Sequence, residues 1–315
     1  MHGRTYTMRR SILLLWVTFA AGLVCCACAK PDFVRSNPRL TFSEAKTNPS
    51  AYKKKAAIVA PRVATTPYAQ TAETILSQQI IETIRNSDHD LILLDQKTNQ
   101  LPDYLKTSNL FIESKTVYGI CEKARSDGFQ FLLQARVLNV APQKRERGIW
   151  WFRKMRYYIA VDLGLDIYDA ITAAKLMNQV KSTEVEVRQS DYEEMVAGHA
   201  GEIREVNELV ADMAQTLGHE AISAIRNAMW MAPVIDIQDN RIIFAVAGSA
   251  GVKVGDHWMI FEGRRVVTGA EGEQYIAPGY KLADARVVAV EQSKVIATVE
   301  GQNDIRPGDI GCPSR

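Results

Sequence analysis

The pattern of hydrophobic and polar residues begins to predict ordered structure at residue 56. The apolar run 56–60 is followed by Pro61, which is typical of a short buried strand. In 68–87, apolar residues recur every three or four positions and predict an amphipathic helix. The apolar run 91–94 predicts a second strand. The order strand, helix, strand indicates a right-handed crossover unit packed on a sheet.

The same kind of pattern continues to residue 228. A helix is expected at 115–126, a strand at 129–140, and a second helix at 202–228. Between them, apolar and polar residues alternate over 155–168, and 176–187 returns as the antiparallel partner of that strand. Two connections, one around Pro102 and the charged 141–154, are expected to be loops, and a polar stretch follows residue 187. The fold class expected for the whole chain is α+β, with 54–229 forming a mixed α/β domain.

From residue 231 the pattern changes to short strands separated by glycine-containing turns. The expected strands are 234–237, 241–246, 258–261, 281–290 and 294–299. This spacing predicts a small all-β, barrel-like domain over 230–315. Within it, 251–256 and 304–309 resemble each other, and each ends in Gly-Asp. Glycine permits a positive backbone φ and Asp hydrogen-bonds nearby amides, so Gly255-Asp256 and Gly308-Asp309 are predicted to be structural turns.

The N-terminus carries the signature of an export signal. Arg9 and Arg10 form a basic start, and the apolar run 12–24 is shorter than the ~20 residues that a membrane-spanning helix needs. Three cysteines then resemble a bacterial lipobox, so 1–27 is predicted to be a lipoprotein signal peptide that leaves Cys28 as the lipidated residue. Cys26 is the alternative site. A plain signal peptide or a single membrane anchor is the alternative interpretation of the whole segment.

The segment that would follow the cleavage site lacks an apolar period. Residues 28–53 are rich in Pro, Asn, Ser and Lys, which predicts a flexible tether between lipid and fold. Neither Cys26 nor Cys28 is followed by Asp, the residue that favours inner-membrane retention in enteric lipoproteins. This resemblance implies anchoring at the outer membrane, facing the periplasm, rather than at the inner membrane.

Composition and charge exclude few classes of protein. The 315 residues are 47% hydrophobic and 23% charged, which is ordinary for globular protein, and the formal net charge is only +2. A nucleic-acid partner is therefore not implied by bulk charge. Of the five cysteines, only Cys121 and Cys312 lie beyond the three of the lipobox-like segment. They are expected to remain unlinked, and a disulfide between them in an oxidising compartment is the alternative.

The sequence predicts no catalytic residue, no metal site and no cofactor. Beyond residue 27 its histidines are His89, His199, His219 and His257, without the spacing of a zinc site. A nucleophile elbow and a phosphate-binding glycine loop are also lacking. The chain is therefore expected not to be an enzyme. A hydrolase site in which His89 meets acids or a hydroxyl from distant segments stays open as an alternative.

One segment has the composition of a binding surface. Residues 144–156 combine three aromatic side chains with six basic ones. Such mixtures are favoured at interfaces because they offer a large contact area with polar ends. They also suit a lipid surface, whereas nucleic acid is rarely met by an exported protein. The predicted interaction residues are Trp150, Trp151, Phe152, Arg153 and Arg156. Alternatively, Trp150 and Trp151 divide between the core and a loop.

These patterns also resemble known families. Residues 54–229 are similar to the TolB N-terminal domain, the curli-secretion lipoproteins and the middle domain of flagellar assembly protein T. The likeness is carried by the strand and helix at 56–87, the strand ending in acid at 91–95, the helix and Gly-x-x-x-Leu strand at 121–137, and the Asp169-Ala170-Ile171-Thr172 turn. The C-terminal part resembles the C-terminal domain of flagellar assembly protein T at 242–260 and at its final Pro-Gly-Asp.

The resemblance implies a non-catalytic outer-membrane or periplasmic lipoprotein that scaffolds an envelope assembly, one form of which is a flagellar basal-body ring. Its implied partners are envelope proteins, other copies of itself in a ring, and the membrane through the N-terminal lipid. The alternatives are a curli-type secretion channel subunit and an envelope enzyme with an unrecognised site.

Overall fold

The structure is a computed structural model that describes residues 40–45, 52–59, 67–87, 90–97, 101–107, 114–198, 202–299 and 304–314. It contains helices and sheets together, and a closed barrel near the C-terminus. A five-stranded sheet has the order β2-β1-β3-β4-β5. Its strands are β1 (Lys54–Ile58), β2 (Leu91–Leu94), β3 (Phe131–Arg147), β4 (Lys154–Asp169) and β5 (Lys175–Val187).

The expected strand–helix–strand unit is present. Helix α2 (Pro67–Ser87) connects β1 to β2, and these two strands are parallel neighbours. β3 is also parallel to β1, whereas β4 and β5 follow as antiparallel neighbours. Because parallel strands need a crossover connection and antiparallel strands only a hairpin, the sheet changes from helix-linked to hairpin-linked at β3.

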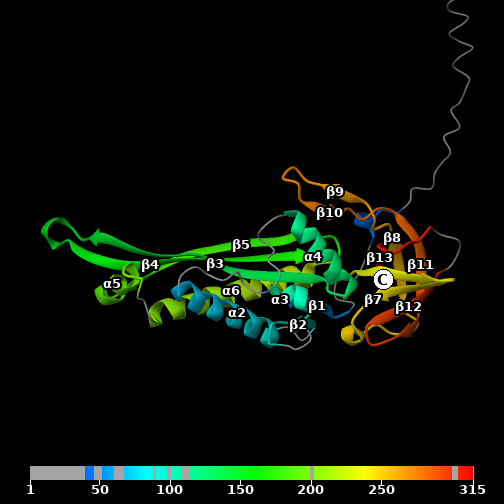
Figure 1. Ribbon diagram of the computed structural model, residues 1–315, viewed down its shortest axis with the longest axis horizontal. Helices are drawn as coiled ribbons and strands as arrows, with labels where there is room; N and C mark the ends of the chain where they lie inside the picture. The colour runs from blue at the N-terminus through cyan, green and yellow to red at the C-terminus, as the bar shows by residue number, and fades with distance from the viewer. Residues whose placement is uncertain are drawn as a thin grey trace, which may run out of the picture. The chain divides into compact units, whose positions relative to one another are not determined.

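Helices lie on both faces of the sheet, along one face and near one end of the other, as Figure 1 shows. Helices α2 and α6 (Arg204–Asn227) pack on one face, and α3 (Asp103–Thr107) and α4 (Ser114–Ser126) on the other. The two helices α2 and α6 approach closely at Gly218, where an added Cβ would lie 2.9 Å from the Thr83 side chain. A glycine inside α6, unfavourable for an isolated helix, is therefore required by this contact.

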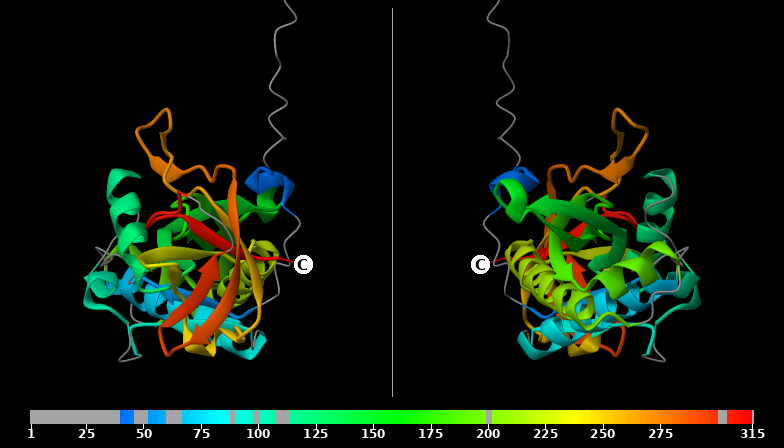
Figure 2. Two further views of the ribbon diagram at one scale, coloured as in Figure 1. Left: turned by 90° about the vertical axis from the view of Figure 1, so that its right-hand side faces the viewer. Right: turned by 90° about the vertical axis from the view of Figure 1, so that its left-hand side faces the viewer.

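Strands β6 (Ala232–Gln238), β7 (Arg241–Ala245), β8 (His257–Phe261), β11 (Lys281–Val290), β12 (Lys294–Val299) and β13 (Ile310–Pro313) close into a six-stranded barrel. The left view of Figure 2 faces this barrel. Its buried side chains form a core of their own, centred on Trp230, Phe244 and Trp258. Strands β9 (Val266–Thr268) and β10 (Gln274–Ile276) form a separate two-stranded arm. The expected barrel-like architecture is confirmed, while the limits of independent domains stay a prediction.

The barrel is an internal repeat. A hairpin, a Gly-Asp turn and one strand occur first as β6-β7-β8 and again as β11-β12-β13. The pairings correspond under exchange of the two halves, since β6 pairs with β13 as β11 pairs with β8. The same exchange maps the β7–β12 pair and the β8–β13 pair each onto itself. The weak similarity of 251–256 to 304–309 is the trace of this repeat in the sequence.

Several expected boundaries need correction. The charged connection 141–154 is mostly strand, because β3 continues to Arg147 and β4 begins at Lys154. The polar stretch after β5 contains helix α5 (Gln189–Val196), and the loop around Pro102 contains α3. β9, β10 and β13 were not expected at all. These strands have three or four residues each, too few to establish an alternating pattern.

Parts of the expected tether 28–53 make contacts with the barrel. The 3-10 helix η2 (Phe42–Glu44) places the Phe42 ring edge-on to Phe261, with 5.2 Å between ring centroids. Tyr52 packs against Trp230, and the Tyr52 hydroxyl donates a hydrogen bond to Asp256 at 2.7 Å. Within the described ranges, none of the helices has the length and apolar content to cross a membrane.

Candidate functional site

The candidate site lies at the end of the hairpin formed by β3 and β4. These strands pair from Phe131 opposite Asp169 to Arg147 opposite Lys154. β5 ends at Val187, opposite Tyr157, so only two strands continue beyond that point. Figure 1 shows the hairpin running on past the ends of its neighbours, with α5 beside it. We call residues 148–153, which connect the two strands, the tip.

The tip holds four consecutive large apolar side chains in solvent. Ile149, Trp150, Trp151 and Phe152 are 71–81% exposed. Trp150–Phe152 form a short 3-10 helix (η3), closed by a hydrogen bond from the Phe152 amide to the Ile149 carbonyl at 3.1 Å. The Trp150 and Trp151 rings meet edge-on, with 5.0 Å between their centroids. The apolar side chains are thus displayed on a hydrogen-bonded turn.

The backbone of the tip adopts a conformation that costs free energy. Trp150 has a φ of 53°, in the left-handed region that a bulky residue rarely occupies. Gly148 has a φ of 133°, and a Cβ on it would collide with the Phe152 carbonyl. Such strain costs about 1–3 kcal/mol per residue and clusters at functional positions.

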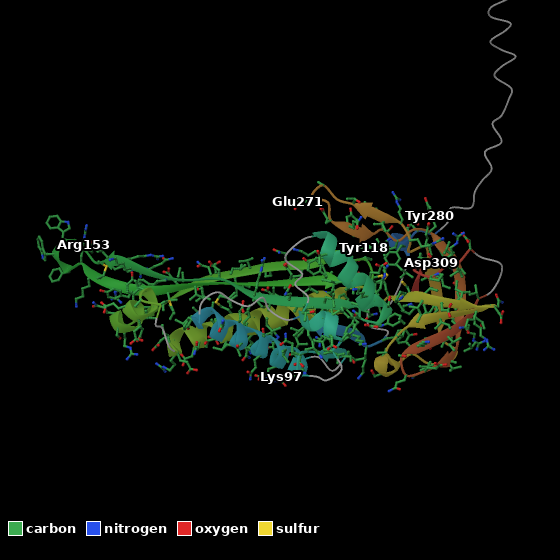
Figure 3. The ribbon with its side chains drawn as sticks, viewed as in Figure 1. Lys97, Tyr118, Arg153, Glu271, Tyr280 and Asp309 are labelled. Atoms are coloured by element: carbon green, nitrogen blue, oxygen red, sulfur yellow. The ribbon has the colours of Figure 1, made fainter. Side chains whose placement is uncertain are left out.

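Basic side chains lie directly behind the tip. Arg145 forms a salt bridge with Glu184 at 2.7 Å, and Arg156 forms one with Glu186 at 2.7 Å. Both arginines are therefore held along the β3–β4 hairpin by acidic residues of β5. The Arg153 guanidinium lies 3.6 Å from Glu146. Figure 3 labels Arg153 at the outer end of the hairpin.

Three further bases in this region, Lys144, Arg147 and Lys154, form no ion pair with any residue that the structure describes. All three are exposed, and Arg147 lies 5.5 Å from the Tyr158 ring. We call these three residues the collar. The tip and the adjoining part of the β3–β4 hairpin therefore carry a local excess of positive charge, although the net charge of the whole chain is small.

The structure brings the five predicted interaction residues together. Trp150, Trp151 and Phe152 form the apolar part of the tip, while Arg153 and Arg156 lie at and just behind its end. Neither tryptophan enters a core. Their role in binding stays a prediction.

The two Gly-Asp turns have matching geometry. Gly255 and Gly308 have φ values of 97° and 96°. The Asp256 carboxylate accepts a hydrogen bond from the Lys253 amide, and the Asp309 carboxylate one from the Arg306 amide, both at 2.8 Å.

Asp309 is fully buried, and its carboxylate also accepts hydrogen bonds from the Gly263 amide and the Arg264 guanidinium. Both turns precede strands that pair in the barrel, β8 and β13. These contacts hold the barrel together.

The remaining candidates for chemistry are dispersed. His219 lies in α6 and His257 in β8, while His89, His199 and both candidate lipidation sites, Cys26 and Cys28, lie outside the described residues. Within the described part of the chain, no group of three His, Cys, Asp or Glu side chains could hold a metal ion.

The structure also draws attention to Asp169, a partly buried carboxyl group at the end of β4. Desolvation raises the pKa of Asp169 to about 6, although its carboxylate accepts hydrogen bonds from the Ile171 and Thr172 amides. The Asp-Ala-x-Thr turn was its signal in the sequence. Desolvation likewise raises the pKa of two free thiols, that of Cys121 to about 12 and that of Cys312 as well. The negative charge of Asp169 raises both thiol pKa values further.

A cleft of about 550 Å³ lies between β2 and the loops of the barrel. Lys55 lines it, but the Lys55 ammonium donates to the Asp127 carbonyl at 2.8 Å and lies 4.0 Å from the centre of the Phe129 ring. This lysine is therefore already engaged within the protein.

Comparison with known proteins yields weak structural likenesses. No family model matches the chain, and no curated protein sequence matches it. A minor lipoprotein from Acinetobacter baumannii aligns with 54% of this chain and 93% of its own, at 11% identity and a TM-score of 0.28. The PelC dodecamer from Paraburkholderia phytofirmans aligns with 56% of this chain and 89% of its own, at 14% identity and a TM-score of 0.28.

TolB from Acinetobacter baumannii aligns with 81% of this chain and 62% of its own, at 10% identity and a TM-score of 0.25. TM-scores this low carry no argument about function. The resemblance to flagellar and curli proteins stays a prediction from the sequence.

Proposed function

We propose that this protein is a non-catalytic, lipid-anchored protein of the bacterial outer membrane, and that it scaffolds an envelope assembly from the periplasmic side. In this proposal, Cys28 carries the lipid and the hairpin presents the tip to another component of the envelope. A flagellar basal-body ring is one such assembly. The predicted export signal and the lipobox-like cysteines of the sequence support the location.

The observation that carries the proposal is the display of Ile149–Phe152 on a strained turn. Apolar side chains on a free loop would fold back against the protein to leave water. Here the positive φ of Trp150 and the requirement for glycine at position 148 hold them outward. Exposed apolar groups bordered by charged residues mark interaction sites.

A photoreactive amino acid at position 151 tests the proposal in intact cells. On irradiation, we expect covalent adducts with one envelope component, identified by mass spectrometry. The matched control is the same group at Val254, which is 66% exposed on the barrel side of the chain. Equal, non-specific labelling from both positions would refute the role of the tip.

Membrane anchoring has its own test. Metabolic labelling with a radioactive fatty acid should mark the wild-type protein and the Cys26→Ser variant, but not Cys28→Ser. A Cys28→Ser protein that still carries the label would refute the assignment of the lipid to Cys28.

The alternative, a curli-type channel subunit, requires lipid-facing strands of alternating apolar residues in a closed barrel. The β3–β4 hairpin is long enough, but its outer part carries Lys144, Arg145, Glu146 and Arg147 in succession, all exposed. Charged residues on both faces of a ribbon oppose insertion across the bilayer. Conductance of purified protein in planar bilayers would favour the channel.

A further inference from the structure

We propose that the tip inserts into the interfacial layer of a phospholipid bilayer, while the collar binds anionic headgroups. This rests on the proposed function and names the envelope component that the tip contacts. It adds a second membrane contact to the acyl chain predicted at Cys28.

The order of the side chains along the hairpin favours a bilayer. The apolar residues Ile149–Phe152 stand at the extreme end, and the collar lies behind them. In strand register, the collar extends from the Arg147–Lys154 pair to Lys144, which is opposite Tyr157. Three residues of strand span about 10 Å.

That distance is somewhat longer than the polar layer of a membrane is deep. A bilayer is about 40–45 Å thick with a hydrocarbon core of about 30 Å, which leaves a headgroup layer of about 5–7 Å on each side. Interfacial proteins bury apolar side chains about 5–10 Å into this boundary. With the tip at that depth, the Arg147–Lys154 pair lies among the phosphates and Lys144 lies at their outer edge. Tryptophan and phenylalanine at the tip also fit the residues favoured at membrane interfaces.

Charge complementarity identifies the lipid class. The segment 144–156 holds six basic residues and one acidic residue, Glu146. Arg145 and Arg156 are neutralised by acids of β5, but the collar is not paired with any described residue. Unpaired bases at a surface favour phosphatidylglycerol or another anionic lipid over zwitterionic phosphatidylcholine.

The shape of the hairpin end also favours lipid over a protein partner. Stable protein interfaces bury about 800 Å² on each side. Beyond Val187 the sheet has narrowed to two strands, and the apolar side chains stand on the six-residue tip. Fluid lipid closes around such a narrow, convex group, whereas a protein would need a matching pocket.

Tryptophan fluorescence tests the inference directly. The mature chain, 28–315 with Cys28→Ser, carries no lipid and retains four tryptophans. Trp230 and Trp258 are buried, so a spectral change on adding vesicles reports Trp150 and Trp151. With vesicles of phosphatidylcholine and phosphatidylglycerol, we expect a blue shift, quenching by lipids brominated on their acyl chains, and weakening by salt.

Variants separate the apolar and charged contributions, with binding measured by co-sedimentation. The variant Trp150→Ser, Trp151→Ser, Phe152→Ser should bind at least about tenfold more weakly, because binding scales with buried apolar area. Trp150→Phe, Trp151→Phe should retain binding.

Each base near an anionic surface contributes about fivefold. Lys144→Gln, Arg147→Gln, Lys154→Gln should therefore lower the partition constant roughly 100-fold. The matched control, Arg241→Gln, Arg286→Gln, Lys294→Gln, removes the same charge from exposed positions of the barrel and should bind like wild type.

Two results would overturn the inference: unshifted and unquenched emission in the presence of vesicles, or equal binding by the collar variant and its control. If position 151 captures a specific envelope protein in cells while vesicles give no signal, the proposed function stands and the lipid inference fails. If vesicles quench the tip but position 151 cross-links neither phospholipid nor a specific protein in cells, the proposed function fails instead.

Discussion

Lys54 is expected to be a main determinant of the stability of the α/β sheet and its helices. Its side chain is 5% exposed, although lysine is almost never buried without partners. Its ammonium donates hydrogen bonds to the carbonyls of Ile225, Arg226 and Ala228 at 2.6, 2.9 and 2.7 Å. These carbonyls belong to the C-terminal end of α6, where few backbone amides remain as donors; the Ile225 carbonyl also accepts a hydrogen bond from the Ala228 amide at 3.2 Å. Lys54 therefore joins β1 to the C-terminus of α6.

Replacement by Met keeps the length of the side chain and removes the charge. A hydrogen bond to a charged group contributes about 1.5–3 kcal/mol, and a cation at a partly buried helix C-terminus up to about 2 kcal/mol. Burial of the ammonium costs several kcal/mol, which offsets a large part of this gain. We therefore expect Lys54→Met to lower the free energy of unfolding by about 3 kcal/mol.

Urea unfolding followed by far-ultraviolet circular dichroism measures this loss through the helices, while tryptophan fluorescence reports Trp230 and Trp258 in the barrel. The matched control is Lys53→Met, since the Lys53 side chain is exposed and its substitution should change stability by less than about 0.5 kcal/mol. If Lys54→Met is as stable as Lys53→Met, the buried ammonium does not hold the end of α6.

Three further outcomes follow from buried polar groups. Because the pKa of Asp169 is raised to about 6 in the folded protein, the free energy of unfolding should fall by about 2–3 kcal/mol as pH rises from about 4 to 6. Urea unfolding measured across this pH range should show the decline in the wild-type protein and not in Asp169→Asn. Asp309→Ala leaves the Gly263 amide without its acceptor, so thermal unfolding should show a free energy of unfolding lower by about 3 kcal/mol. The control Asp304→Ala, which removes an exposed carboxylate, should lower it by less than about 1 kcal/mol. Native Cys121 and Cys312 should react with a thiol reagent only at the rate of unfolding, because burial raises their pKa values; rapid labelling of folded protein would contradict this.

Much of the architecture followed from local pattern. The strand–helix–strand unit, the alternation over 155–168 and the long amphipathic helix were predicted with boundaries that differ by only a few residues from β1, α2, β2, β4 and α6. Such periodicity is local, because each side of a helix or strand meets one environment. The segment 144–156 was also recognised from its composition.

The length of the hairpin was not predicted, because residues 144–147 are charged and have no apolar period. Strand β4 nevertheless pairs with them, since ladder hydrogen bonds join main-chain groups whatever the side chains are. Closure of the barrel depended on β13, where Gly311 has no side chain because the rings of Phe244 and Trp258 occupy the space. The position of β13 is set by the residues that pack against it, so its own residues carry little pattern from which a strand could be predicted.

The sequence alone determined the longer helices and strands, the two Gly-Asp turns, and which segment is rich in aromatic and basic residues. Only the tertiary structure decided that Trp150 and Trp151 are exposed together, and that Lys54 rather than Lys53 or Lys55 binds the end of α6. The physical reason is the range of the interactions. Periodicity and turn chemistry act over a few neighbouring residues, whereas burial and hydrogen-bond partners are set by segments far apart in the chain.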